Sequence, residues 1–279
     1  MGKVNADLHT HLRTRADISN LDFNQVIDLA RERLGPGGIL GVVNFADRHY
    51  EQFVGKRGYE RHDLSNGVYV PEKKVLVVKG EEVATKQGHL LVLGIRKNRH
   101  LAHDRTLDDT IREAKQGNGI MIADHPFTYF GIGKQLERVY NIGGKILSSE
   151  YLEKLDAIEV HNGEASLSPR NPNKKAQEFF RRMRYFNPKL GALIVSDGHS
   201  LKEVGISYTT LEMPDYETIT SPYLLVDHLR KAIQNHRDFS GKMTGARFMA
   251  ILHLLAIMGD KASSKARQTV QYVARKFKK

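Results

Sequence analysis

The sequence contains no cysteine and no run of the roughly 20 apolar residues that span a bilayer, and its start lacks the charged-then-apolar pattern of a signal peptide. Without cysteine the chain forms no disulfide, no thiolate metal site and no cysteine nucleophile, so any metal ion must be bound by His, Asp and Glu. We therefore expect no transmembrane segment and predict a cytoplasmic protein. At 279 residues the chain can form one large α/β domain or two small ones.

Positive charge is concentrated near the carboxyl terminus. Residues 241–279 contain nine Lys and Arg residues against one acidic residue, which gives this segment +8 and leaves +3 of the formal net charge of +11 for the rest. Within it, residues 245–259 predict an apolar helix that is buried or forms an oligomer, and residues 263–279 predict a basic amphipathic helix. Such a segment binds nucleic acid or acidic lipid, or is simply a docked helix with a solvated basic face.

Apolar runs typical of strands alternate with amphipathic helical patterns along most of the chain. This alternation favours parallel strands joined by crossover helices. Residues 46–71 are polar and aperiodic, and they are predicted to be a functional loop or an insertion. The spacing predicts helices over residues 23–35, 106–117, 148–155, 173–186 and 221–236, and strands over residues 38–45, 73–85, 87–95, 119–127, 156–163 and 191–200.

Side chains with metal-binding or catalytic chemistry collect where these strands end. In the first run, KVNADLHTHLRT, His9 and His11 are two positions apart, so on an extended strand both imidazoles face one point. In α/β barrels the carboxyl ends of the strands carry the catalytic residues, because the loops there meet at one mouth. Five strand ends therefore predict one shared site. The polar residues at the other four are Glu81, Glu82, His125, Glu159, His161, Asn162, Asp197 and His199.

The motifs DLHTH, GEE followed by GHLLVLG, ADHPF, IEVHN and SDGHS resemble, in order and approximate spacing, those of the PHP superfamily, the polymerase and histidinol phosphatase domains. The resemblance implies a distorted (β/α)7 barrel whose strand ends hold two or three divalent ions, with phosphoester hydrolysis as the usual reaction. We accordingly predict a PHP-type barrel over residues 1–240 and a basic helical extension over residues 241–279.

Carried over position by position, the resemblance also implies the metal ligands. His9, His11 and Asp197 match the residues that share one ion, and Glu82 matches the carboxylate that bridges two ions. Glu81 would point to the opposite face of its strand, as a surface or loop carboxylate. The full set of predicted ligands is His9, His11, Glu82, His89, His125, Asp197 and His199.

The sequence departs from the family pattern at a third ion. His199 matches a ligand of that ion, but Phe45 stands where the family usually has a histidine, and Ala16 stands where an acidic residue or histidine often follows the first motif. Asp47 and His49 lie just beyond Phe45 and could substitute, or could be ordinary loop residues. We therefore predict two divalent ions, Zn²⁺, Mn²⁺ or Fe²⁺, and leave a third open.

The predicted protein is a metal-dependent phosphoesterase that attacks a phosphate ester with a metal-bridging hydroxide. Asp197 or His199 would move protons, and Arg13, Arg15 and Asn162 would bind the substrate. A small phosphorylated metabolite, a nucleotide and an oligonucleotide end all fit as substrates. Two alternatives stay open: a nuclease whose residues 241–279 hold nucleic acid, and a non-catalytic PHP module that binds nucleic acid. The sequence does not predict an oligomeric state.

Overall fold

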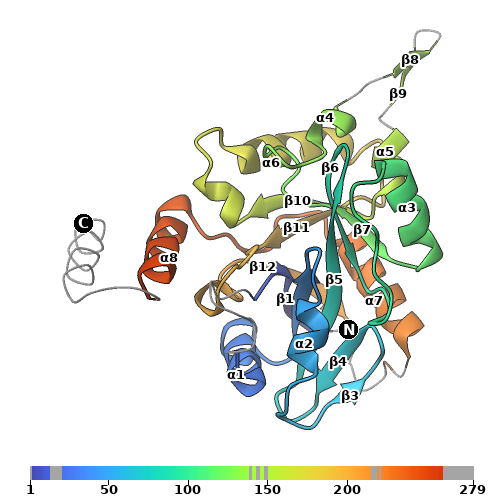
Figure 1. The fold of residues 1–279 in the computed structure, drawn as a ribbon. Coiled ribbons are helices and arrows are strands. Elements are labelled where there is room, and N and C mark those ends of the chain that lie inside the picture. Colours follow the sequence, from blue (N-terminus) through green and yellow to red (C-terminus); the bar gives the residue numbers. More distant parts are fainter. Residues whose placement is uncertain are drawn as a thin grey trace.

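A computed structural model describes residues 2–12, 21–137, 140–142, 145–147, 150–214, 219 and 221–259 (Figure 1). Eleven strands form one sheet, and β8 (Tyr140–Ile142) pairs with β9 (Lys145–Leu147) in a separate hairpin. The strands of the large sheet are β1 (Gly2–Thr10), β2 (Gly38–Asn44), β3 (His62–Asp63), β4 (Gly67–Val70), β5 (Val75–Thr85), β6 (Gly88–Leu93), β7 (Ile120–Ala123), β10 (Ala157–Asn162), β11 (Gly191–Val195), β12 (Tyr208–Met213) and β13 (Gly241–Lys242).

The large sheet curls into a nearly closed barrel. Its main strand order is β11-β10-β7-β6-β5-β2-β1-β12-β13, and β1, β2, β5, β7, β10 and β11 all run in one direction. The chain just after β11 returns to β1, where Thr10 and Gly198 form a parallel bridge and the His11 N–H donates to the Gly198 carbonyl at 2.8 Å. This barrel-shaped sheet confirms the distorted barrel predicted from the sequence.

Not all strands follow the predicted parallel pattern, because β6 and β12 run antiparallel to their neighbours. Only Lys86 and Gln87 separate β5 from β6, and a connection this short can join only antiparallel strands. Residues 46–71, predicted to be a functional loop or an insertion, contain a short helix and the β3–β4 hairpin. The helix forms because Tyr50 and Phe53 become buried in the core.

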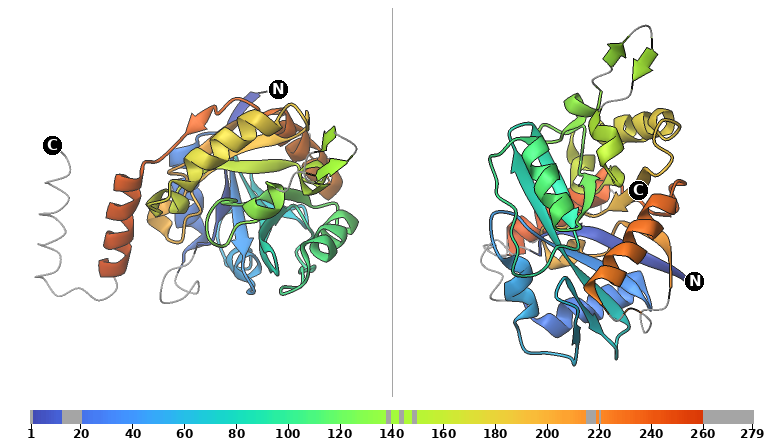
Figure 2. Two further views of the ribbon diagram at one scale, coloured as in Figure 1. Left: turned by 90° about the horizontal axis from the view of Figure 1, so that it is seen from above. Right: turned by 90° about the vertical axis from the view of Figure 1, so that its right-hand side faces the viewer.

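Helices cover the outside of the barrel (Figures 1 and 2). In the first of them, Asp22 caps the Gln25 N–H at 2.9 Å, Phe23 to Leu34 bury one face, and Gly35 ends the helix at φ 80°. The helices are α1 (Phe23–Leu34), α2 (His49–Val54), α3 (Leu107–Gln116), α4 (Gly133–Leu136), α5 (Glu150–Lys154), α6 (Pro172–Met183), α7 (Pro222–Asn235) and α8 (Ala246–Gly259), with 3-10 turns η2 (Glu164–Leu167) and η3 (Leu201–Glu203).

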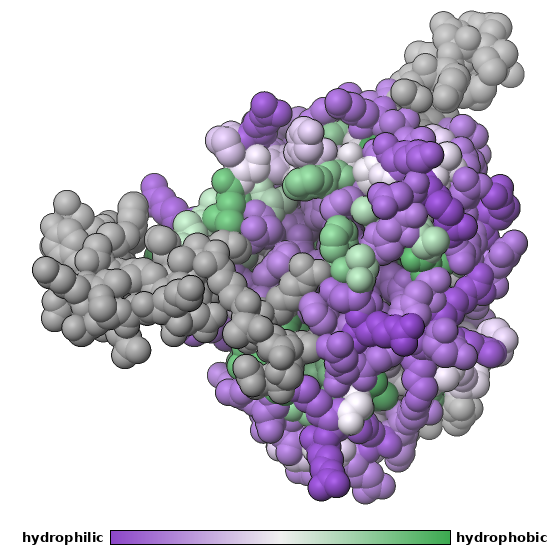
Figure 3. Space-filling view, in the orientation of Figure 1, coloured by the Kyte–Doolittle hydropathy of each residue, from purple (hydrophilic) through white to green (hydrophobic). Residues whose placement is uncertain are grey.

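Strands β2, β7, β10 and β11 are buried on both faces, which explains their continuous apolar runs. On β2, Ile39 and Val43 join the cluster inside the barrel, whereas Leu40 and Val42 pack outward with α1 and α2. Helix α7 adds Leu225 and neighbouring side chains to the inner cluster. Most of the face seen in Figure 1 is hydrophilic, with apolar side chains reaching it in a few patches (Figure 3).

Helix α8 lies at the edge of the barrel (Figures 1 and 2). Met249 and Leu252 pack with Ile206 and Leu167, whereas the Phe248 side chain is exposed. The helix predicted over residues 263–279 lies outside the described residues, so the division at residue 240 stays a prediction. None of the helices in the described part of the chain combines the length and apolar character needed to cross a membrane.

Candidate metal centre

Four side chains from three strands converge at the carboxyl end of the barrel. His9 and His11 come from the end of β1, Glu82 from β5, and Asp197 from the turn after β11. The His9 and His11 Nε2 atoms lie 3.2 Å apart, and each lies 3.4 Å from Asp197 Oδ1. Glu82 Oε2 lies 3.0 Å from His11 Nε2 and 3.7 Å from His9 Nε2. The four donor atoms therefore enclose one point.

This spacing suits a metal ion. Ligand atoms about 2.1 Å from a tetrahedral ion lie about 3.4 Å from one another, which is close to the separations found here. Asp197 Oδ1 is also buried and has no hydrogen-bond partner among the described residues. In addition, two imidazole nitrogens face each other although at most one of them can donate to the other. The donor set therefore fits a divalent cation.

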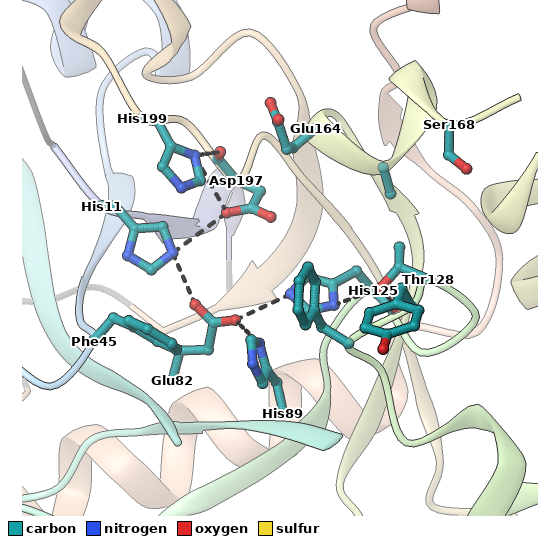
Figure 4. Close-up of a pocket in the computed structure, with 13 residues that line it drawn as sticks. His11, Phe45, Glu82, His89, His125, Thr128, Glu164, Ser168, Asp197 and His199 are labelled. Atoms are coloured by element: carbon teal, nitrogen blue, oxygen red, sulfur yellow. Dashed lines mark hydrogen bonds and ion pairs between the residues drawn. The ribbon is translucent and has the colours of Figure 1, made fainter. Parts of the chain in front are cut away.

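A second group of ligands lies on the other side of Glu82. Glu82 Oε1 is 2.5 Å from His89 Nδ1, at the start of β6, and 3.1 Å from His125 Nε2, just after β7. Asp124 Oδ2 lies 3.4 Å from the same His125 nitrogen. Figure 4 shows Glu82 between His11 on one side and His89 and His125 on the other. Each oxygen of this one carboxylate thus faces a different pair of histidines.

His199 lies beside the first group, with its ring centroid 4.7 Å from that of His11 and its Nδ1 donating to the Asp197 carbonyl at 2.9 Å. His11, Asp197 and His199 form a third candidate ligand group. The two residues that could have substituted at a third ion interact with each other: His49 Nδ1 lies 3.2 Å from Asp47 Oδ2, at the start of α2. His11 and Asp197 could therefore bind a third ion together with His199, whereas β2 supplies no ligand for that ion.

A buried carboxylate, Asp7, holds the two sides of the centre together. It accepts hydrogen bonds from the Ser196 N–H at 3.0 Å, the Ser196 hydroxyl at 2.6 Å and the Gly205 N–H at 2.8 Å. Burial raises the pKa of Asp7 to about 7, and these hydrogen bonds limit the rise. Asp7 thereby fixes the strand that carries His9 against the turn that carries Asp197.

Residues around the ligands set the orientation of the imidazoles. His9 Nδ1 donates to Glu159 Oε1 at 2.8 Å, and His125 Nδ1 lies 3.1 Å from the Thr128 hydroxyl, which itself donates to the His125 carbonyl. With a proton on each Nδ1, both Nε2 atoms have a lone pair directed at the centre. Asp124 and Thr128 were not predicted from the sequence, although Asp124 stands next to His125 in the ADHP motif.

Two sequence interpretations need correction. Asn162, predicted to bind substrate, is fully buried, and its amide donates to Glu159 at 2.9 Å and to Asp197 at 3.0 Å, so it orients these carboxylates instead. Glu81 is not a surface carboxylate. It is buried beneath the chain that follows β6, where it accepts the Leu101 N–H at 2.7 Å and lies 3.2 Å from the buried Lys79 amine. Arg13 and Arg15 lie outside the described residues.

The charges in the centre favour a bound cation. Burial lowers the pKa of His125, but the Asp124 and Glu82 carboxylates outweigh burial and raise this pKa to about 10. Burial raises the pKa of Glu82, but hydrogen bonds from the surrounding histidines hold it well below its usual range. Burial, against the opposing charge of His125, raises the pKa of Asp124 to about 7. The carboxylates thus stabilise positive charge at this point.

The backbone is strained where these side chains turn into the site. His125 and Asp197 have φ values of 27° and 53°, in a region that residues other than glycine rarely adopt. Each such residue costs on the order of 1–3 kcal/mol and persists only where the surrounding structure holds it in place. The strain coincides with the two turns that carry candidate ligands.

No protein-family model and no curated protein matches the sequence. Among solved structures the chain is similar to an Endonuclease Q complex with a 27-mer duplex that has an abasic lesion at the active site (TM-score 0.54, 15% identity, covering 88% of this chain and 61% of that chain). It is also similar to the lesion-specific endonuclease PfuEndoQ from Pyrococcus furiosus (TM-score 0.54, 15% identity, 86% and 57%) and to PsfC from Pseudomonas syringae PB-5123 (TM-score 0.56, 16% identity, 92% and 98%).

The chain spans about three-fifths of the Endonuclease Q chains that it matches, and almost the whole of PsfC. At these identities the likeness shows a shared fold. That fold agrees with the distorted α/β barrel predicted from the sequence.

Proposed function

We propose that the protein is a metal-dependent phosphoesterase with two divalent ions bridged by Glu82. The observation that carries this proposal is the position of Glu82, whose two oxygens face separate histidine pairs at 2.5–3.7 Å. His9, His11 and Asp197 would hold one ion, and His89 and His125 the other. The mixed nitrogen and oxygen donors suit Zn²⁺, Mn²⁺ or Fe²⁺. When bound, such ions would neutralise phosphoester charge and lower the pKa of a bound water.

His199 has the properties of the residue that moves protons. Burial lowers its pKa despite the neighbouring Asp197 carboxylate, so the imidazole is neutral near pH 7. Its Nδ1 proton is donated to the Asp197 carbonyl, which leaves Nε2 as the acceptor, and the side chain is 39% exposed in the wall of the cavity beside the centre. Nε2 can therefore take a proton from a water and return it to a leaving group.

A neighbouring cavity gives the substrate access to these residues. The cavity has a volume of about 610 Å³ and is lined by His11, Glu82, His89, His125, Asp197 and His199 among others. His9 is fully buried behind them. A phosphate group entering from the cavity would meet the ligands of both proposed ions together.

The test combines metal content with turnover. Purified protein supplied with Zn²⁺ or Mn²⁺ is analysed for bound metal, and hydrolysis of glycerol 2-phosphate is followed by phosphate release. We expect about two ions per chain and turnover in the wild type. Glu82→Gln should lose at least one ion and most of the activity, whereas His62→Ala, at an exposed position on β3, should change neither. Wild-type protein that binds no metal and hydrolyses no phosphoester would overturn the proposal.

Cleavage of nucleic acid is a second candidate function. Two observations favour it: the fold is shared with Endonuclease Q, and residues 241–279 carry a net charge of +8. If these residues hold a polynucleotide, deleting residues 260–279 should weaken cleavage of polynucleotides and leave turnover of glycerol 2-phosphate intact. Equal effects on both substrates would count against a nuclease. Full-length protein that binds no metal would instead favour a non-catalytic module that binds nucleic acid.

A further inference from the structure

We infer that the cavity beside the metal centre binds a nucleobase stacked on Tyr129 and Phe130, so that the substrate is a nucleotide or the end of a nucleic-acid strand. This inference rests on the proposed function, because it names what is attached to the phosphate. It starts from two aromatic side chains that line the cavity, Tyr129 and Phe130, which are 91% and 58% exposed. Neighbouring apolar side chains that are exposed within a cavity are typical of a ligand-binding site.

The chemistry of the cavity wall indicates a flat, uncharged group. Away from the candidate ligands the wall consists of Phe45, Ala165 and the two exposed aromatics, together with a few hydroxyl and carboxyl groups. Among the described residues that line the cavity none is Lys or Arg. A ligand rich in phosphate would be expected to meet such cations, particularly the guanidinium forks that grip phosphate. A volume of about 610 Å³ also far exceeds what a single phosphate needs.

The aromatic residues are held in place before any ligand arrives. The Phe130 carbonyl accepts the His89 N–H at 2.8 Å, and the Gly133 N–H donates to the Pro126 carbonyl at 2.7 Å. A Cβ at position 131 would lie 2.4 Å from two carbonyl oxygens, so only Gly131 allows this compact loop. A loop fixed in this way loses little conformational entropy when a base stacks on it.

The position of Phe130 ties the aromatic surface to the reacting end of the cavity. Its ring is stacked on His89, with centroids 5.4 Å apart and planes 15° apart, and the Tyr129 ring meets it edge-on at 5.2 Å. Phe130 therefore places the aromatic surface directly beside His89, a candidate metal ligand. A base joined through its sugar to a phosphate at the metals would reach this surface.

Polar groups also line the cavity. Glu164, from η2, and Ser168 line the wall opposite Phe45 and His89 (Figure 4). Carboxylate and hydroxyl oxygens there suit the exocyclic amino groups of a base and the hydroxyls of a sugar. The cavity thus offers both a stacking face and hydrogen-bonding groups.

The inference is tested with 2-aminopurine, whose fluorescence is quenched when it stacks. The monophosphate of 2-aminopurine riboside is titrated into Zn²⁺-loaded protein, and ribose 5-phosphate serves as the competitor without a base. We expect quenching, and weaker competition by ribose 5-phosphate. The double variant Tyr129→Leu/Phe130→Leu should bind the nucleotide about 5- to 100-fold more weakly. The control is Tyr185→Leu/Phe186→Leu, an exposed aromatic pair outside the cavity, which should bind as the wild type does.

Equal affinity of the wild type and the cavity variant for the nucleotide, or equal affinity of the wild type for nucleotide and ribose 5-phosphate, would overturn the inference. Metal content and turnover of glycerol 2-phosphate test the proposed function separately, since neither depends on a base. An oligonucleotide with 2-aminopurine at its end, compared with the mononucleotide, separates the two sources of the base. Tighter binding of the oligonucleotide identifies a strand end, and tighter binding of the mononucleotide identifies a free nucleotide.

Discussion

Replacing Glu159 by glutamine should weaken metal binding by His9 without removing any candidate ligand. Glu159 accepts three hydrogen bonds, from His9 Nδ1 at 2.8 Å, the His125 N–H at 2.7 Å and the Asn162 amide at 2.9 Å. The last two share Oε2, so the single oxygen of a glutamine must stay there. Its NH₂ group then faces His9 Nδ1, which can accept that hydrogen bond only by giving up its proton.

The proton of His9 would consequently move to Nε2, the atom that faces His11 and Asp197. A protonated Nε2 has no lone pair for a metal, so each binding event must first reverse the tautomer and break the new hydrogen bond. Changes at such supporting residues typically weaken metal affinity 10- to 100-fold, which corresponds to about 1.4–2.7 kcal/mol.

The assay is a competition for Zn²⁺ between the protein and a chelating dye, with Glu137→Gln as the control. Glu137 is paired with Lys175 on the surface, outside the centre. Glu159→Gln should weaken at least one ion by the stated factor, and thermal unfolding should show that the variant is folded. Unchanged Zn²⁺ affinity in a folded Glu159→Gln protein would refute the reasoning about the His9 tautomer.

Three further predictions concern stability. Burial lowers the pKa of His161 from 6.5 to about 4 in the folded protein, so the unfolded chain takes up the proton at a higher pH. The free energy of unfolding should therefore fall by about 3 kcal/mol as the pH drops from 6.5 to 4. Urea unfolding of His161→Gln should show a smaller pH dependence. Gly41→Ala would place a Cβ 2.2 Å from the Leu8 carbonyl oxygen, so about 1–3 kcal/mol of stability and part of the Zn²⁺ affinity should be lost; unchanged values would show that β1 and β2 can move apart. Lys79→Met removes the buried amine that pairs with Glu51 and Glu81, leaving His100 beside Glu81, and should cost about 3–5 kcal/mol in urea unfolding; a loss below 1 kcal/mol would contradict this.

Much of the fold follows from local sequence patterns. Helix α1 was predictable from the spacing of its apolar residues, its cap and its terminal glycine, and β2 from an apolar run buried on both faces. The antiparallel β5–β6 hairpin was not predicted. The short connection of Lys86 and Gln87, followed by Gly88 with a φ of 129°, was a signal for a tight turn. The helix within residues 46–71 depends on core contacts of Tyr50 and Phe53 that no local pattern reveals.

The candidate site was likewise predictable from the sequence only in part. Residues at strand ends could be grouped from the sequence, because the direction of parallel strands places those ends at one edge of the sheet. The environment of each carboxylate could not be predicted, since it depends on which strands become neighbours. Glu81 and Glu82 are adjacent in sequence, yet one pairs with the buried Lys79 and the other faces the histidines. Likewise, Asn162 is buried by packing around β10 and cannot reach the cavity.

The central claim is that Glu82 bridges two metal ions, and the most direct test is the position of those ions. Anomalous X-ray scattering from crystals grown with Mn²⁺ or Zn²⁺ should show one ion among His9, His11 and Asp197 and another beside His89 and His125, with a Glu82 oxygen bound to each. A single ion, or two ions that do not share Glu82, would contradict the account.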